Sequence, residues 1–270
     1  NECERFVLLK KLMLLRPDYL DVEAIVSTDN IAFLQQISPA TKIIRSIHDF
    51  SETPFSLDAM LDSILHPSVS IYKISTQARS IIDALQMMIW VKRNAAKYNI
   101  VGHCMGENGV CSRIAGAVMG NYFVYAACDH DHSILPCHLT IDELNQVYHI
   151  RKKSTSSHLY ALIGDPVDRS LGHVFHNKYF NQHNINALYV KLRLQSNELS
   201  DLLVYIKQLD FKGVSVTMPL KRAIVTLLDD ELDFNSVNTL KLNKNIITAA
   251  NTDGIAAINV IEQYLDVYKK

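Results

Sequence analysis

The sequence predicts an α/β protein made of two domains. Through the first 150 residues, short β-branched or aromatic runs alternate with apolar residues at helical spacing. This alternation predicts a parallel sheet or barrel with helices outside it. A basic, Ser/Thr-rich stretch at Arg151–Ser157 has no periodicity and is typical of a linker. A second alternation follows it, so we place a first domain at 1–153 and a second at 158–270.

The first domain is expected to hold five strands. Their signals lie at Tyr19–Glu23, Lys42–Ile47, Val69–Ile74, Asn99–Met105 and Tyr122–Ala127, with helical spacing at Ile31–Ile37, Leu57–Leu65 and Ile81–Ile89. The strands recur every ~25–30 residues, about one βα unit of an eight-fold barrel. Five strands cannot close such a barrel. The sequence therefore predicts an open sheet or a partial (β/α)8 barrel that lacks about three units.

The second domain is expected to begin with alternating strands and helices and to end on a hairpin and a helix. The expected strands are Leu159–Gly164, Ala187–Leu192 and Gly213–Thr217, then a hairpin of Thr239–Leu242 and Ile246–Ala250. Helices are expected after Gly172, at Leu199–Leu209, from Pro219 and from Gly254. This order again indicates an α/β domain.

Composition excludes several classes of partner. The 27 Lys+Arg residues balance 28 Asp+Glu residues, a net charge of −1, so we expect no nucleic-acid or membrane-surface partner. No apolar run approaches the ~18 residues of a membrane-spanning helix. Five scattered cysteines without a C-x-x-C pair indicate reduced thiols in the cytoplasm. Because the chain starts at Asn1 without a methionine and ends abruptly at Lys270, we expect a piece of a longer protein.

Lys73 and His48 are candidate catalytic residues of the first domain. Lys73 sits in the apolar strand IYKIS, and burial favours a neutral amine that can form a Schiff base. His48 follows the preceding strand, so adjacent parallel strands would bring both side chains to one rim, where a histidine can move protons. The alternatives are a lysine that reaches solvent at the strand end and a structural histidine.

Three stretches in order resemble the type I 3-dehydroquinate dehydratase family: SIHDFSETP around His48, KIS at Lys73, and MGENGVCSR, which ends at Arg113. The resemblance implies a lyase of the TIM-barrel class in which Lys73 forms an imine with the substrate ketone. It further implies His48 as general base and acid, and Arg113 as the partner of the substrate carboxylate.

Two departures from that family affect its site. The closing loop S-A-P-G-Q is replaced by residues 134–138, which puts Ile134 and His138 where serine and glutamine contact substrate. The acidic residue and arginines on the family's first strands are expected to have no counterpart here. Separately, Cys128–His132 with Cys137 and His138 could suggest a metal site, but the spacing fits no established ligand pattern, so we expect no metal.

Four further stretches resemble the substrate domain of shikimate dehydrogenase. They are GDPVDRSLGHVFHN, VTMPLK, VNT and NTDG, in that order between 164 and 254. The resemblance implies Lys221 and Asp253 as a catalytic pair that binds and protonates the carbonyl oxygen. The remaining implied site residues, which would hold the substrate carboxylate and hydroxyls, are Ser170, Thr217 and Asn238.

On the residues alone, these stretches could equally be turns and helix caps. Gly172 and His173 depart from the family's Ser-Pro. The family uses NADP, but no G-x-G-x-x-G loop occurs in the 270 residues, so we expect the NADP-binding (Rossmann) domain to lie outside this chain and no cofactor residues within it.

With both resemblances in this order, the chain is similar to the bifunctional dehydratase/dehydrogenase family of the shikimate pathway, which serves aromatic amino acid biosynthesis. They imply dehydration of 3-dehydroquinate and NADPH-dependent reduction of 3-dehydroshikimate, with small molecules as the partners. Two alternatives remain. One is a non-catalytic regulatory protein that senses quinate or shikimate. The other is a class I aldolase-like Schiff-base lyase, which accounts for Lys73 but not for the second domain.

Overall fold

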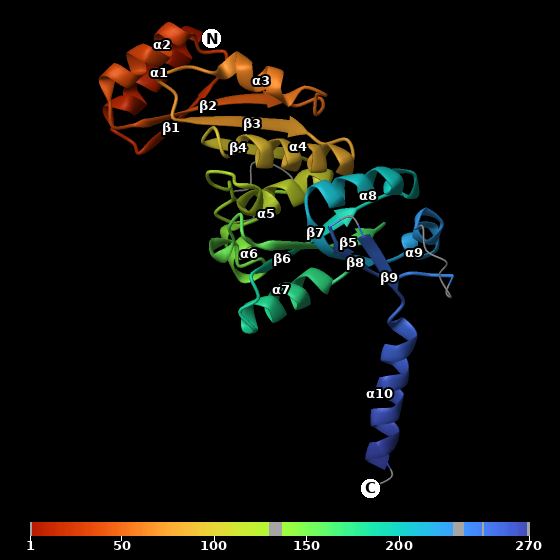
Figure 1. Ribbon diagram of the computed structural model, residues 1–270. Helices are drawn as coiled ribbons and strands as arrows, with labels where there is room; N and C mark the ends of the chain where they lie inside the picture. Colours follow the sequence, from red (N-terminus) through yellow and green to blue (C-terminus); the bar gives the residue numbers. More distant parts are fainter. Residues whose placement is uncertain (1, 130–136, 229–234, 245, 269–270) are drawn as a thin grey trace. The chain divides into compact units, whose positions relative to one another are not determined.

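The computed structural model describes residues 2–129, 137–228, 235–244 and 246–268 (Figure 1). The chain divides into two compact units. Unit 1 comprises Asn1–Asn145 and Ile150–Thr155, and unit 2 comprises Gln146–His149 and Ser156–Lys270. No helix among these described residues is long and apolar enough to cross a membrane.

Unit 1 is built on a parallel sheet in the order β1-β2-β3-β4. The strands are β1 (Tyr19–Glu23), β2 (Lys42–Asp49), β3 (Ile71–Gln77) and β4 (Ile100–Met105). The helices are α1 (Glu2–Leu14), α2 (Thr28–Ile37), α3 (Leu57–Ile64), α4 (Ile81–Asn94), α5 (Val110–Met119) and α6 (Ile141–Gln146), with 3-10 turns at Glu107–Gly109 and Ile150–Lys152. The expected strand–helix alternation with a parallel sheet is confirmed.

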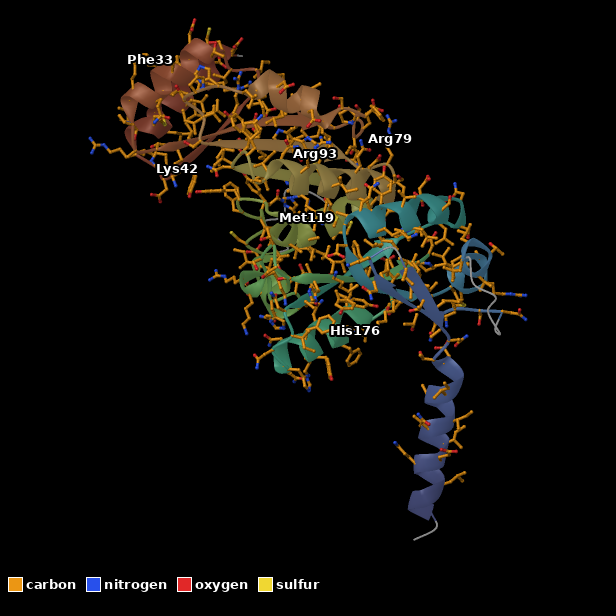
Figure 2. All side chains as sticks on the ribbon, in the orientation of Figure 1. Phe33, Lys42, Arg79, Arg93, Met119 and His176 are labelled. Carbon is orange, nitrogen blue, oxygen red and sulfur yellow. The ribbon has the colours of Figure 1, made fainter. Side chains whose placement is uncertain are left out.

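Local sequence explains where these helices begin and how closely they pack. Ser27, Ser56 and Ser80 cap α2, α3 and α4 by accepting backbone hydrogen bonds, since free N–H groups at a helix start need acceptors. Helix α4 lies tightly on β4, because a Cβ built at Gly102 would come within 2.5 Å of Val91 Cγ2. Phe33 of α2, labelled in Figure 2, contacts Phe6 with ring centroids 6.1 Å apart.

The fifth strand expected at Tyr122–Ala127 is wrong: within the described residues unit 1 has four strands. This segment makes an isolated bridge at Ala127 and a backbone hydrogen bond from Tyr122 N–H to Ile100 C=O of β4 at 2.8 Å. Side chains occupy the outer edge of β4 instead. The Asn121 side chain accepts from Gly102 N–H at 2.8 Å and donates to Gly102 C=O at 2.9 Å. The Ser112 hydroxyl accepts from the N–H of Cys104 at 2.9 Å. Three backbone groups that a fifth strand would pair with are therefore already satisfied by side chains.

Unit 2 holds a five-stranded mixed sheet in the order β6-β5-β7-β8-β9. The strands are β5 (His158–Gly164), β6 (Ala187–Arg193), β7 (Phe211–Val216), β8 (Thr239–Asn243) and β9 (Ile246–Ala250). The helices are α7 (Gly172–Gln182), α8 (Leu199–Gln208), α9 (Leu220–Ala223) and α10 (Asp253–Tyr268), with 3-10 turns at Ser196–Glu198 and Ile224–Leu227. β5 pairs in parallel with β6 and β7, and β8 pairs antiparallel with β7 and β9, so the expected hairpin is confirmed.

Candidate functional site

The register of unit 1 places the candidate catalytic residues on one face of the sheet. Ser46 lies opposite Lys73, and His48 lies opposite Ser75. Paired residues of parallel strands share a face, and side chains two apart on one strand point the same way. Lys73 and His48 therefore lie on the same face of adjacent strands. The same rule adds Glu23, which lies opposite Ser46 on β1.

Glu23 is the partner of His48. Its Oε2 lies 2.8 Å from His48 Nδ1 and 3.1 Å from Ser46 Oγ. Burial opposes ionisation of Glu23, but the hydrogen bond and charge of His48 outweigh it, so the pKa of this carboxyl is lowered. A carboxylate can only accept, so Nδ1 carries the proton and Nε2 is left as the basic nitrogen. An acid of β1, a strand present in this chain, is thus paired with His48.

Lys73 is buried beside a second acid of β1. Its side chain is 10% exposed, and Nζ donates to Asp21 Oδ2 at 2.8 Å. The Tyr125 ring lies against the same ammonium, 4.4 Å from Nζ to the ring centroid. The alternative of a lysine that reaches solvent does not describe this side chain. Sequence reasoning missed Asp21, although its spacing of two from Glu23 in YLDVE signals two carboxylates on one face.

Two further basic groups approach this face. Burial lowers the pKa of Arg113, on α5, to about 10, which leaves it a cation at neutral pH. His103 on β4, opposite Ser75 in the register, is buried with Nε2 3.1 Å from Ser75 Oγ. Burial, followed by the charges of Arg113, Lys73 and His48, holds the pKa of His103 well below its usual range, so this imidazole is neutral. Sequence reasoning did not single out His103.

The loop that departs from the dehydratase family is described only in part. Ile134 lies outside the described residues, as do the last three residues of the Cys128–His132 cluster. His138 is described, and burial followed by the charge of Arg113 lowers its pKa. In the described part of the chain, no group of three or more His, Cys, Asp or Glu side chains is arranged to hold a metal ion.

In unit 2, the structure brings three of the predicted residues together. Lys221 at the start of α9 donates to Asp253 Oδ2 at 2.6 Å. The Asn238 amide donates to Asp253 Oδ1 at 2.8 Å and to Thr252 Oγ1 at 2.9 Å. Hydrogen bonds from Lys221 and Asn238 lower the pKa of Asp253. The carboxylate is thereby fixed between two donors.

Ser170 and Thr217 make other contacts. Ser170 Oγ accepts from the N–H of Gly172 at 3.2 Å, just before α7, whose N-cap residue is Leu171. Thr217 donates its N–H to Ile163 C=O at 2.9 Å and packs over Gly164, where a Cβ would meet its methyl group at 2.3 Å. Among the described contacts, neither residue touches the Lys221–Asp253 pair.

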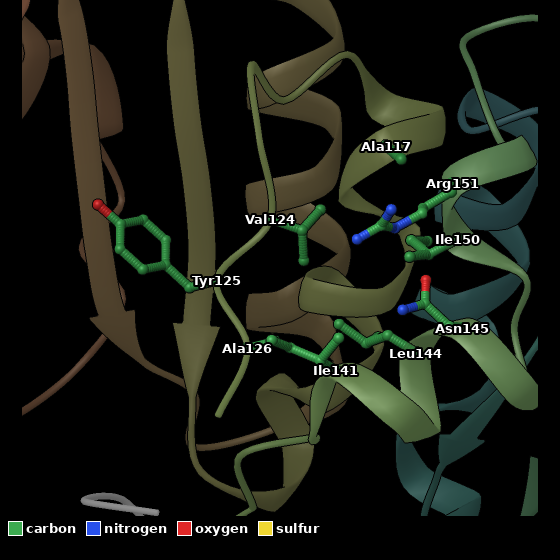
Figure 3. A pocket seen from close by; sticks show the side chains of 9 residues that line it. All are labelled: Ala117, Val124, Tyr125, Ala126, Ile141, Leu144, Asn145, Ile150 and Arg151. Atoms are coloured by element: carbon green, nitrogen blue, oxygen red, sulfur yellow. The ribbon is translucent and has the colours of Figure 1, made fainter. Parts of the chain in front are cut away.

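A cavity of about 530 Å³ lies beside the segment that follows β4, on the side away from Lys73 (Figure 3). Val124 and Ala126 face it, with Leu144 of α6 and Arg151 across from them. The Tyr125 ring points the other way, towards the strands. This alternation separates the cavity from the Lys73 face.

Comparisons with known proteins match both units. The family described as "Type I 3-dehydroquinase" matches residues 1–155, and the "Shikimate dehydrogenase substrate binding domain" matches residues 162–240. The chain is 32% identical to "Shikimate biosynthesis protein AroDE" of Chlamydia muridarum over 260 residues, which is 95% of this chain and 53% of that protein.

Two further relatives cover nearly the whole chain and 40% of it, respectively. The chloroplastic "Bifunctional 3-dehydroquinate dehydratase/shikimate dehydrogenase" of Arabidopsis thaliana is 33% identical over 98% of this chain and 45% of its own length. "Shikimate dehydrogenase (NADP(+))" of Pyrococcus furiosus is 35% identical over 40% of this chain and 41% of its own. The chain thus spans about half the length of the curated relatives that it matches along both units.

Proposed function

We propose, from the premise that this chain belongs to the type I 3-dehydroquinase family, that unit 1 dehydrates 3-dehydroquinate through an imine on Lys73. The observation that carries the proposal is the shared face of β1–β3, where a buried amine lies beside a histidine that is hydrogen-bonded to Glu23. A nucleophile and a positioned base on adjacent strand ends are what imine-dependent elimination requires.

The chemistry follows from the roles of these groups. Lys73 attacks the ketone, and loss of water leaves an imine whose protonated nitrogen draws electrons from the neighbouring carbon. His48 Nε2 removes a proton from that carbon, and Glu23 stabilises the imidazolium formed. The imidazolium then protonates the hydroxyl that leaves from the next carbon as water. Arg113 would pair with the substrate carboxylate, and hydrolysis of the imine frees Lys73.

Reductive trapping tests this assignment. Borohydride with 3-dehydroquinate should reduce the imine to a stable secondary amine, and peptide mass spectrometry should place the adduct on Lys73. Lys73→Arg should abolish the adduct, whereas Lys97→Arg, on an exposed turn beside Tyr98, should leave it unchanged. No adduct, or an adduct on another lysine, overturns the proposal.

For unit 2 we propose binding of shikimate and 3-dehydroshikimate, with Lys221 as the proton donor to the carbonyl oxygen and Asp253 holding it in place. Asn238 shares Asp253 and would also contact a ring hydroxyl. We propose Ser170 and Thr217 as further contacts to the substrate, supported by the family match that includes both positions.

NADP is the cofactor in the name of the Pyrococcus furiosus relative, and we propose that the complete enzyme uses it. The 270 residues contain no glycine-rich nucleotide-binding loop, so the groups present do not fit NADP. The role proposed for this chain is to bind substrate and to place a proton.

Calorimetry with shikimate tests this role without the cofactor. Lys221→Ala should weaken shikimate binding at least tenfold, because it removes the donor to the substrate oxygen. Lys212→Ala is the matched control, since Lys212 pairs with Asp210 in the same unit away from Asp253. Equal affinities for both variants would contradict the assignment.

The organisation that we propose is a bifunctional shikimate-pathway enzyme with domains at 1–153 and 158–270. The first would be part of a (β/α)8 barrel and the second a substrate domain whose nucleotide-binding partner lies elsewhere in the complete protein. The two family matches, at 1–155 and 162–240, support these limits. We also propose a reducing, cytoplasm-like compartment, supported by five scattered cysteines that form no C-x-x-C pair.

A further inference from the structure

The ammonium of Lys73 lies among three elements of unit 1. Asp21 comes from β1, Lys73 from β3, and Tyr125 from the segment after β4. Asp21 Oδ2 accepts from Lys73 Nζ at 2.8 Å and from the Tyr125 hydroxyl at 3.1 Å. One carboxylate oxygen thus joins the nucleophile to a tyrosine whose ring also covers that nucleophile.

We propose that Asp21 is the counterion of the protonated imine formed at Lys73, and that Tyr125 is the positioning residue that holds Asp21 for this role. The proposal rests on the imine chemistry of the proposed function and adds to it the group that stabilises the cation.

The argument begins with the nitrogen itself. An ammonium has three N–H donors, whereas a protonated imine keeps a single N–H and the full positive charge. The imine must stay protonated to draw electrons from the neighbouring carbon. An acceptor at 2.8 Å from Nζ is already within hydrogen-bond reach of that N–H. A carboxylate is favoured over a neutral acceptor because charge-assisted hydrogen bonds are stronger.

The other titratable groups around Lys73 do not supply this negative charge. On β2, His48 is hydrogen-bonded to Glu23, which is therefore engaged with the base. On β4, His103 is neutral, and on α5, Arg113 is a cation. His138, beyond the segment of Tyr125, is a neutral or cationic group. Among these groups, Asp21 is the carboxylate in direct contact with Nζ.

Tyr125 is suited to hold Asp21 in place. Its phenol is half-buried, and burial followed by the nearby Asp21 charge raises the pKa of this hydroxyl, so it remains a donor at neutral pH. The hydroxyl binds the same Oδ2 that faces Lys73, which fixes the carboxylate rotamer. The ring face, 4.4 Å from Nζ, is also favourable to a cation.

Trapping as a function of pH tests the proposal in the 270-residue chain. With saturating 3-dehydroquinate, the yield of borohydride adduct on Lys73 is measured by mass spectrometry from pH 5 to 10. For Asp21→Asn we expect at least a tenfold lower initial trapping rate at neutral pH. We also expect a lower pH limit, by which we mean the alkaline pH above which trapping is lost, than in the unsubstituted chain, because the imine deprotonates more readily without its counterion. Asp21→Glu should restore part of the rate.

Tyr125→Phe separates positioning from bulk structure, since it removes the hydroxyl and keeps the ring. We expect a two- to fivefold lower trapping rate and a pH limit displaced in the same direction as for Asp21→Asn. Asp62→Asn on α3 and Tyr98→Phe after α4 are matched controls and should leave both readouts unchanged. Circular dichroism checks that each variant is folded. If Asp21→Asn does not fold, Tyr125→Phe decides through its pH limit.

The outcomes separate this proposal from the one on which it rests. No adduct on Lys73 in the unsubstituted chain overturns the imine mechanism itself. A normal adduct there, with an unchanged rate and pH limit in Asp21→Asn or, if that variant is unfolded, in Tyr125→Phe, overturns the counterion and leaves the imine intact.

Discussion

The Asn121 side chain pairs with the outer edge of β4 where a fifth strand would bind, and we expect its removal to destabilise unit 1. In Asn121→Ala, the amide that pairs with the N–H and C=O of Gly102 is lost. β4 is buried along its whole length, so these two backbone groups would lie unpaired at its outer edge. The methyl group of alanine has neither a donor nor an acceptor for these two groups.

The expected cost follows from the groups left behind. A lost intramolecular hydrogen bond is worth about 0.5–1.5 kcal/mol net, and a buried group left unsatisfied costs ~1–3 kcal/mol. Two such groups, partly rescued by water at the sheet edge, give a loss of roughly 2–4 kcal/mol in the free energy of unfolding of unit 1. That loss is a large share of the stability of an ordinary domain.

Urea unfolding followed by tryptophan fluorescence measures this loss in unit 1 alone. Trp90 is the single tryptophan of the sequence, and it is buried in α4 against the strand that contains Gly102. The fluorescence transition should move to lower urea without a change in slope. The matched control is Asn99→Ala, which removes one exposed hydrogen bond to Ser70 C=O and should cost less than about 1 kcal/mol. An Asn121→Ala loss no larger than the control loss would refute the reasoning.

Three further variants test other parts of the structure. Glu23→Gln should lower the dehydratase kcat by roughly 10- to 100-fold, because the amide cannot stabilise the imidazolium. The contribution of the Glu23 carboxylate should persist at neutral pH and be lost as pH falls through its lowered pKa. An enone-absorbance assay that shows less than a twofold change in kcat would contradict this role. Gly102→Ala should cost ~1–3 kcal/mol through the 2.5 Å approach to Val91, and an unchanged urea midpoint would contradict this. Asn238→Ala should raise the pKa of Asp253 towards its ordinary value, and a carboxyl NMR titration without displacement would disprove the hydrogen bond's role.

The sequence predicted the strands better than the contacts between them. The run at Tyr19–Glu23 has the same bounds in the structure, because β-branched and aromatic residues between turns are a strong local signal. The same signal failed at Tyr122–Ala127. A strand also needs a free edge to pair with, and the Asn121 side chain had taken that edge. The hydrogen bonds of a single side chain to a strand edge do not change the periodicity of apolar residues in the sequence, so the pattern could not predict them.

The candidate sites show the same limit. His48 and Lys73 were placed on one rim from strand order alone, and the register agrees with that placement. Their acidic partners were missed, because the sequence does not state that β1 lies next to β2. In unit 2 the motifs indicated which residues to examine, but only Lys221, Asn238 and Asp253 are in mutual contact.

The two carboxylates of β1 cannot be understood separately. Each has its own cationic or protonated partner, and the charge of Asp21 also acts to raise the pKa of Glu23. Lys73 donates a hydrogen bond to Asp21, and the hydrogen bond and charge of His48 keep the pKa of Glu23 lowered despite the charge of Asp21. In the imine that we propose at Lys73, Asp21 would keep the positive charge on the same nitrogen, so the charges beside Glu23 would be unchanged. The spacing of two residues in YLDVE thus couples the nucleophile to the base. Substitutions at these four positions should therefore not be additive.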